Sequence, residues 1–229
     1  KLHGYAVGAD GTILRTKDGG FTWEPQSSPA DVSLSDVFAL GRETAIIVGT
    51  RGTILITDDG GSRWRRVRVD IKDHLYGVAF AGEGHRTGWA AGTYGRILKT
   101  LDGGETWASL AQATDQHLMK ISALDADHAA AAGIDGTVLI SGDGGESWST
   151  SKPCGNSSMT GIAFVNTEAV VAIGSGGCAV RSVDKGRSWS RINLFSRSDL
   201  LSLSFSNGKF GSMTDTNGMV WLTGDGGST

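Results

Sequence analysis

The densest charged feature of the sequence is a cluster of arginines around one tryptophan. The cluster comprises Arg51, Arg63, Arg65, Arg66 and Arg68. Guanidinium groups bind carboxylates through paired hydrogen bonds, so the cluster predicts a surface for an acidic segment of a partner protein. Two alternatives stay open. The charges could keep an exposed sheet edge from pairing with other chains, or bind nucleic acid, which is less favoured because only Trp64 is interleaved.

Histidine, aspartate and tyrosine side chains form a second candidate site. When the repeats described below are aligned, the loops that lead into each first strand place five residues in one column: Ser33, His74, His117, Ser158 and Asp199. The tips of the next hairpins are expected on the same face: Asp10, Arg51, Tyr94, Asp135, Gly176 and Asn217. In a ring of repeats this face surrounds the mouth of a central channel, which makes His74, His117, Asp199 and Tyr94 candidates for binding.

A metal ion or a carboxylate could bridge the two histidines of this column, because His74 and His117 come from adjacent repeats. No third close ligand for such a site is evident. We therefore expect no metal and no cofactor. The variety of the hairpin tips, in a chain that is otherwise repetitive, is what an asymmetric binding face requires.

Three carboxylates near the same face raise a glycosidase alternative, since Asp31, Asp73 and Asp199 could supply a paired acid and base. The predicted connections are short, whereas substrate clefts usually require long insertions. The sequence also has no G-x-S-x-G, P-loop or H-E-x-x-H motif. It therefore favours a protein that is not an enzyme, with glycan binding or glycoside hydrolysis as the alternative.

The two cysteines, Cys154 and Cys178, map to that loop face within one repeat. Two cysteines fit neither a disulfide-rich scaffold nor a zinc site with paired ligands. Their positions are compatible with one disulfide and also with two buried free thiols.

The elements that must position these residues come from an internal repeat of about 41 residues. A turn motif recurs as TKDGGFTW from Thr16, TDDGGSRW from Thr57, TLDGGETW from Thr100, SGDGGESW from Ser141, SVDKGRSW from Ser182 and TGDGGST from Thr223. The starts are separated by 41, 43, 41, 41 and 41 residues. Upstream segments such as YAVGADGTILRT indicate a strand, a tight glycine turn and a strand, with one further strand on each side.

Four short strands per repeat predict a small twisted sheet, which must stack on its neighbours as a blade of a β-propeller. The aspartates of the turns would accept backbone N–H groups; they are Asp18, Asp59, Asp102, Asp143, Asp184 and Asp225. The closing tryptophans would insert between blades; they are Trp23, Trp64, Trp107, Trp148 and Trp189. Six near-identical turns cannot all be one active site, so both sets are assigned to the fold.

We expect one all-β propeller domain over residues 1–229, with six repeats of which the first and last are incomplete. The first repeat begins at its second strand, and the last stops before its tryptophan. Closing the ring would need about 17 further residues with six blades and about 58 with seven, at 41 per repeat. This predicts that the chain is part of a longer, seven-bladed propeller.

The turn motifs that carry the repeated aspartates are called Asp boxes. Tandem Asp boxes with a closing tryptophan, together with a G-x-x-G-T-I-L-x-T strand pair, resemble the photosystem II stability and assembly factor propellers. The resemblance covers the whole chain. It implies an extracytoplasmic scaffold without catalytic activity, which holds a membrane-protein subunit during assembly through an arginine-rich surface. The chain resembles more loosely the BNR repeats of sialidases and the repeats of xyloglucanases, but Arg191-Ile192-Asn193 is late and lacks the sialidase proline.

Composition limits the remaining function classes. Lys and Arg number 21 against 24 Asp and Glu, so no overall basic field predicts a nucleic-acid or membrane-surface partner. The sequence contains no run of about 18 apolar residues, so it predicts no membrane span. The segment Lys1-Leu2-His3-Gly4 has neither an initiator methionine nor the apolar core of a signal peptide, so location in the periplasm or a lumen is expected from the resemblance alone.

Overall fold

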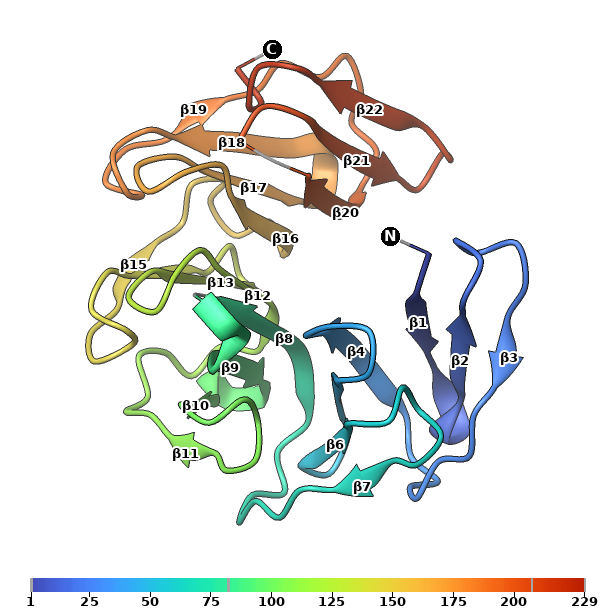
Figure 1. Cartoon of the computed structure of the whole chain (residues 1–229). Coiled ribbons are helices and arrows are strands. Elements are labelled where there is room, and N and C mark those ends of the chain that lie inside the picture. The colour runs from blue at the N-terminus through green and yellow to red at the C-terminus, as the bar shows by residue number, and fades with distance from the viewer. Residues whose placement is uncertain (1, 82, 207, 229) are drawn as a thin grey trace. The chain divides into compact units, whose positions relative to one another are not determined.

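The computed structural model describes residues 2–81, 83–206 and 208–228. The chain divides into two compact units, Lys1–Leu110 and Ala111–Thr229, and each contains three antiparallel sheets (Figure 1). Four short 3-10 turns interrupt the described strands: η1 (Ala9–Gly11), η2 (Glu83–His85), η3 (Thr93–Gly95) and η4 (Ser175–Gly177). No helix among the described residues is long and apolar enough to span a membrane. The all-β class is confirmed, whereas a single domain over residues 1–229 stays a prediction.

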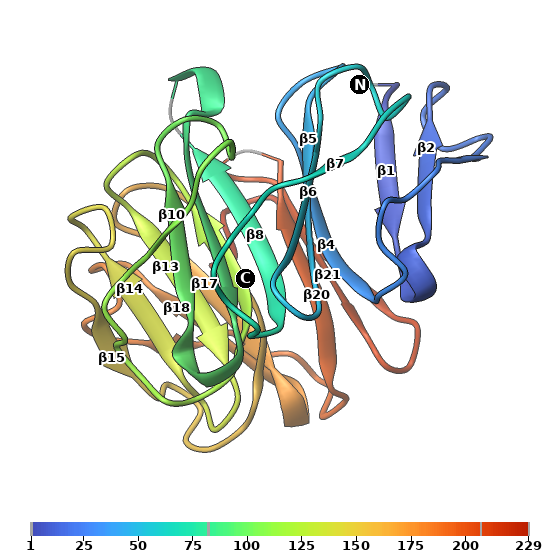
Figure 2. The ribbon, with the colours of Figure 1, turned by 90° about the horizontal axis from the view of Figure 1, so that it is seen from below.

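The first unit contains one sheet of three strands and two of four. The first sheet consists of β1 (Gly4–Val7), β2 (Ile13–Thr16) and β3 (Glu24–Pro25). The second consists of β4 (Leu34–Ala39), β5 (Ala45–Gly49), β6 (Thr53–Thr57) and β7 (Arg65–Arg66), and Figure 2 shows β4, β5 and β6 side by side. The third consists of β8 (Leu75–Ala81), β9 (Thr87–Gly92), β10 (Ile97–Thr100) and β11 (Ala108–Ser109).

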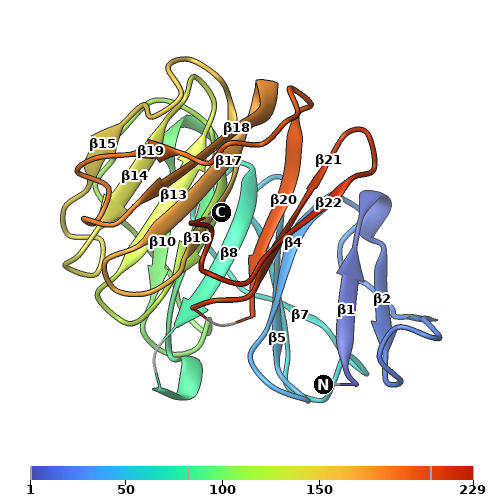
Figure 3. The same cartoon turned by 90° about the horizontal axis from the view of Figure 1, so that it is seen from above.

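The second unit contains two sheets of four strands and one of three. The fourth sheet consists of β12 (Leu118–Ala123), β13 (Ala129–Gly133), β14 (Val138–Ser141) and β15 (Ser149–Ser151). The fifth consists of β16 (Met159–Phe164), β17 (Val170–Gly174), β18 (Cys178–Ser182) and β19 (Ser190–Arg191). The sixth consists of β20 (Leu200–Phe205), β21 (Gly211–Asp215) and β22 (Val220–Thr223), which lie side by side in Figure 3.

The second strand is buried along its whole length in three of the four-stranded sheets. Every residue of β5, β13 and β17 is buried. A continuous apolar run is typical of such a strand. Four consecutive alanines form β13 despite the high helix propensity of alanine, because small side chains allow a closely packed neighbour. Ala130 and Ala132 pack with residues of the fifth sheet such as Ile162.

The closing tryptophans do not all insert between sheets as predicted. Trp64 is 4% exposed and packs between the first and second sheets. Trp107 and Trp189 are partly buried against the clusters that join their own sheets to the preceding ones. Trp23 is 42% exposed, so the prediction of burial is wrong there. Trp64, Trp107 and Trp189 thus each pack toward the sheet that precedes their own.

Candidate protein-binding surfaces

Four of the six turns that carry the repeated aspartates are closed by the same set of hydrogen bonds. At Asp18, the Thr16 hydroxyl donates to Oδ1 at 2.8 Å, and the Thr22 N–H donates to Oδ1 at 2.9 Å. The Thr22 hydroxyl donates to Oδ2 at 2.6 Å. Equivalent bonds close the turns of Asp102, Asp143 and Asp184. The aspartates therefore act on the backbone of their own turns, as the sequence predicts.

These bonds favour the ionised carboxylate, and they lower the pKa of Asp18, Asp143 and Asp184 to about 2. The largest cause in each is the hydrogen bond from the hydroxyl four residues on. Burial raises the pKa of Asp102, but the bonds from Thr106 and Thr100 outweigh it, and that pKa is also about 2.

We expect the melting temperature to fall as the pH is lowered from 4 to 2. The folded pKa is depressed from 3.8 to about 2. The stabilisation is therefore present above the unfolded pKa and is lost as the pH falls through the folded one. Circular dichroism at pH 5, 4, 3 and 2 measures it. Asp143→Asn should reduce the dependence of the melting temperature on pH, whereas Asp127→Asn, at an exposed loop position, should not. Equal melting temperatures at pH 5 and 2 would contradict a stabilising role for the ionised aspartates.

The column of residues that leads into the first strands has the same backbone role in five of the six sheets. The carbonyl of each column residue accepts the N–H of the residue that follows the second strand of the same sheet. The donors to Ser33, His74, His117, Ser158 and Asp199 are Thr50, Thr93, Ile134, Ser175 and Thr216, all at 2.9 Å. The constant contribution of the column is to join the first strand to the following hairpin, and its place around a channel mouth stays a prediction.

Two side chains of the column also connect neighbouring sheets within one unit. The His74 Nδ1 accepts the backbone N–H of Arg51 at 3.2 Å, and the Asp199 Oδ1 accepts that of Gly176 at 2.7 Å. In both cases the donor is the hairpin tip of the preceding sheet. These two atoms are therefore engaged in holding the loop face. Among the described residues no three His, Cys, Asp or Glu side chains are grouped to hold a metal, and a bridge between His74 and His117 stays a prediction.

The hairpin tips present different side chains on the same backbone. Asp10, Tyr94 and Asp135 have φ of 53°, and Arg51 has φ of 57°. These are left-handed conformations that the following glycines extend. Tyr94 is 64% exposed. The hairpin of Asn217 differs, because the Asp215 carboxylate accepts the N–H groups of Asn217 and Met219. Most of the variable face is thus carried on rigid turns.

The structure separates the arginine cluster. Only Arg65 and Arg66 lie in β7, the edge strand of the second sheet. Arg63 precedes it in the turn, and Arg68 follows it. Arg51 lies at the β5–β6 turn, at the opposite end of β6 from Arg63. Pairing with β6 covers Arg65 and Arg66, and the Val67 N–H also donates to the Ile54 carbonyl at 2.9 Å, so Arg63 and Arg68 lie at either end of the paired segment.

Two of these guanidinium groups have partners within the first unit. Arg65 forms an ion pair with Glu105 of the third sheet's turn, and Arg66 donates to the Thr53 hydroxyl at 3.2 Å. Arg63 and Arg68 are exposed, and their side chains make no ion pair with any described residue. Glu105 was not singled out in the sequence. Its position in the DGGE turn, one repeat after Arg65, is the only sequence signal for the pair.

The three carboxylates of the glycosidase alternative have different surroundings. The Asp73 Oδ2 pairs with the Arg96 guanidinium at 3.0 Å, and the Asp199 carboxylate is bonded as described above. Asp31 is exposed beside a shallow groove of about 740 Å³ that Asp10 also lines. No hydrogen bond joins Asp31 to Asp73 within the described residues of the first unit.

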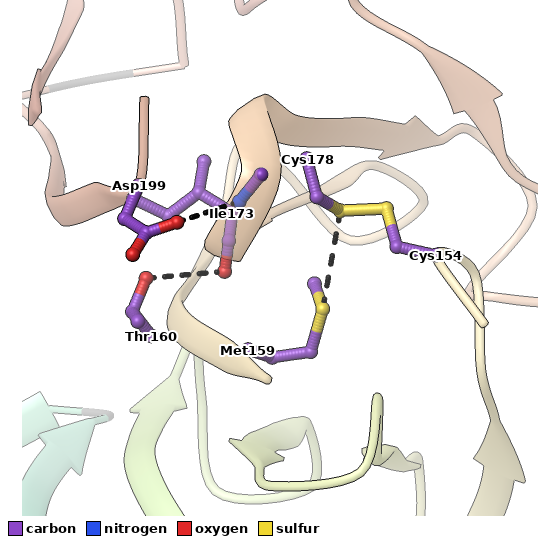
Figure 4. The surroundings of a disulfide bond; sticks show 7 residues. Cys154, Met159, Thr160, Ile173, Cys178 and Asp199 are labelled. Carbon is purple, nitrogen blue, oxygen red and sulfur yellow. Dashed lines mark hydrogen bonds between the residues drawn. A yellow bond between two sulfur atoms is a disulfide. The ribbon is translucent and has the colours of Figure 1, made fainter. Parts of the chain in front are cut away.

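The two cysteines form a disulfide, so the alternative of two free thiols is excluded. Cys154 lies in the connection from β15 to β16, and Cys178 is the first residue of β18. Figure 4 shows the bond beside Met159, whose sulfur lies 4.0 Å from that of Cys178. Thr160 also donates to the Leu200 carbonyl at 2.6 Å, and this bond joins the fifth and sixth sheets.

Comparison with protein families gives matches over the whole chain. One family, described as photosynthesis system II assembly factor YCF48, matches residues 1–73, 26–113, 62–149 and 105–229. The chain belongs to this family. The resemblance drawn from the Asp boxes and strand pairs is therefore confirmed. Comparison with curated proteins gives no match.

Solved structures share the fold at low sequence identity. YCF48 from Cyanidioschyzon merolae is 22% identical, with a TM-score of 0.68, over 100% of this chain and 92% of that one. A structure described as YCF48 bound to D1 peptide is 20% identical, with a TM-score of 0.50, over 96% and 87%. An ancestral GH74 enzyme is 12% identical, with a TM-score of 0.73, over 96% of this chain and 36% of that one. These likenesses show a β-propeller fold.

Proposed function

We propose that this chain is a non-enzymatic scaffold that holds a segment of a membrane-protein subunit while a membrane complex is assembled. Membership of the YCF48 family over the full length of the chain carries the proposal. A similar propeller is described as bound to a D1 peptide, which supports a peptide segment as the ligand. The rigid hairpin tips with varied side chains support it further, because such turns form a preorganised binding face.

The exposed arginines supply the charge for recognising an acidic segment. Arg63 and Arg68 project from either side of β7 without ion-pair partners among the described residues, whereas Arg65 is held by Glu105. An acidic peptide that follows the edge of the second sheet would meet both free guanidinium groups. Arg51, at the other end of β6, would contact a separate part of the partner.

A location outside the cytoplasm is part of the proposal. The Cys154–Cys178 disulfide supports it, because disulfides form and persist in oxidising compartments. The alternative of a glycoside hydrolase is not proposed, because Asp73 and Asp199 each have a carboxylate oxygen engaged in fixed contacts and the GH74 likeness extends to the fold alone.

The expected result of reversing the two free charges is loss of the partner. The immobilised chain is incubated with detergent-extracted membranes, and captured membrane subunits are quantified by mass spectrometry. Arg63→Glu with Arg68→Glu should reduce recovery of the specific subunit at least tenfold, since exposed charges at an interface govern association with an acidic partner. The matched control is Arg187→Glu with Arg191→Glu, two exposed arginines around Trp189. Equal recovery with both double variants would contradict this site.

A further inference from the structure

A pocket of about 260 Å³ lies between the fourth and fifth sheets, at the end that carries their turn motifs. Four connections of the second unit line it. The β12–β13 connection contributes His128, the β14–β15 connection Gly142, the β16–β17 connection Thr167, and the β18–β19 connection Lys185 and Arg187. The titratable residues of this lining are all basic, so the pocket predicts an anionic ligand.

Lys185 occupies a backbone position that the other five turns give to glycine. Its φ is 60°, and the equivalent glycines have φ between 69° and 81°. A lysine in this left-handed conformation is strained where a glycine is not, and strain of this kind is found at functional sites. The Lys185 Nζ lies 3.3 Å from the Glu168 Oε1 in an exposed ion pair, which an anion could replace.

Arg187 supplies a second cation to the same pocket. Its side chain is exposed and makes no ion pair or hydrogen bond with any described residue. The equivalent groove between the second and third sheets is not basic at the three corresponding positions, which are occupied there by Thr44, Gly103 and Glu105. Positive charge at these positions is therefore a property of the groove between the fourth and fifth sheets and not of the repeat.

The His128 ring is held in place by Asp125. Its Nδ1 lies 2.8 and 2.9 Å from the two carboxylate oxygens, and the side chain is 20% exposed. Burial raises the pKa of Asp125, but the hydrogen bonds from the His128 ring and from the N–H groups of Asp127 and His128 outweigh it and lower that pKa. The ionised carboxylate thus accepts from Nδ1. The other ring nitrogen, Nε2, is left for a ligand, and a Cβ on Gly142 would lie 4.0 Å from it.

We propose that this pocket binds a small phosphomonoester. Lys185 and Arg187 donate to the phosphate oxygens, and the His128 Nε2 donates when protonated or accepts from a protonated phosphate oxygen when neutral. The organic group packs on Ile140 and Phe164, which form the apolar part of the lining. A phosphate has three acceptor oxygens and a charge of nearly −2 at neutral pH, so it matches several cationic donors better than a carboxylate does.

The pocket goes beyond the proposed function. It lies in the second unit, whereas the arginine cluster around Trp64 lies in the first. Its ligand is a small molecule and not the membrane subunit, so the two sites are tested independently.

Phenyl phosphate is the probe, titrated at pH 7 into the ¹⁵N-labelled whole chain and followed by the amide resonances. We expect saturable shifts at Gly142, Thr167 and Lys185, with a dissociation constant below about 1 mM. Lys185→Gly installs the residue of the other five turns, so it should weaken binding by about fivefold or more without lowering the melting temperature. Arg187→Gln should weaken binding similarly, whereas Arg191→Gln, at an exposed position of β19 outside the pocket, should not.

A change that strengthens binding separates a binding role from a structural one. Glu168→Gln removes the ion-pair partner of Lys185, so it should tighten binding of phenyl phosphate about threefold. Inorganic phosphate should bind about fivefold more weakly than phenyl phosphate, because it lacks the group that packs on Ile140 and Phe164.

Four results would overturn the proposal. The first is the absence of saturable shifts with phenyl phosphate, and the second is an affinity that Lys185→Gly leaves unchanged. The third is binding of benzoate as tight as that of phenyl phosphate, which would assign the pocket to carboxylates. The fourth is equal affinity for inorganic phosphate, which would assign it to the free ion.

Discussion

A Gly92→Ala variant is expected to be less stable than the wild type by about 3 kcal/mol, at the upper end of the cost of overpacking. A Cβ on Gly92 would lie 1.9 Å from the His74 carbonyl oxygen and 2.9 Å from its carbon. Both are backbone atoms that cannot rotate away. The φ of Gly92 is −163°, an extended value open to any residue, so the cost arises from contact alone. Urea unfolding followed by circular dichroism measures it.

The matched control is Gly41→Ala, where a Cβ would meet nothing within 4 Å. Gly41 has no positive φ, and its change should cost less than about 0.5 kcal/mol. Similar midpoints for the two variants would show that the column carbonyl can withdraw. The same close approach recurs in three other sheets. A Cβ on Gly49, Gly133 or Gly174 would lie 2.5, 2.1 or 2.4 Å from the oxygen of the column carbonyl.

This close approach explains why one glycine recurs in the strand pairs of the sequence. The sixth repeat has Asp215 at that position, and the bond from Thr216 to the Asp199 carbonyl is kept. The local turn differs there, because the Asp215 carboxylate caps the N–H groups of Asn217 and Met219. A repeat can therefore lose the glycine only by rebuilding the hairpin around a new acceptor.

The period of the turn motif was sufficient to predict the all-β fold class, the sheets and the hairpins, because each repeat contains the same local sequence pattern. The register shift near the start of each first strand was not predictable, since positions such as Asp36 and Gly77 share no residue type. Trp23 shows a second limit. The motif places it in a turn, but its exposure depends on a neighbouring sheet that the motif does not contain.

The roles of the candidate site residues were harder to predict than their backbone positions. Alignment of the repeats gives His74 and Asp199 equivalent positions, but their use as acceptors for the preceding hairpin depends on the spacing between sheets. Closeness in the sequence predicts one arginine cluster around Trp64. The extent of β7 and the contact with Glu105 leave Arg63 and Arg68 as its free members.

Removal of the disulfide is expected to produce the other large effect. Cys154→Ser should lower the free energy of unfolding by about 3 kcal/mol, because the bond closes a loop with a sequence separation of 24 residues and such loops restrict the unfolded chain. This corresponds to a fall in melting temperature of roughly 6–12 °C. Cys154 is the position to change, since Cys178 is 1% exposed and its replacement would also disturb packing. Differential scanning calorimetry measures the change.

Treatment with a reductant distinguishes the effect of losing the disulfide from the effect of changing the residue. Dithiothreitol should lower the melting temperature of the wild type toward that of Cys154→Ser and leave the variant unchanged, and Ser157→Ala, in the same connection, should match the wild type. A variant as stable as the wild type would mean that the β15–β16 connection is held without the bond. The loop leads into Ser158 and β16, so its anchoring also positions the column of the fifth sheet. Reduction should therefore loosen the loop face, which links an oxidising compartment to a preorganised binding surface.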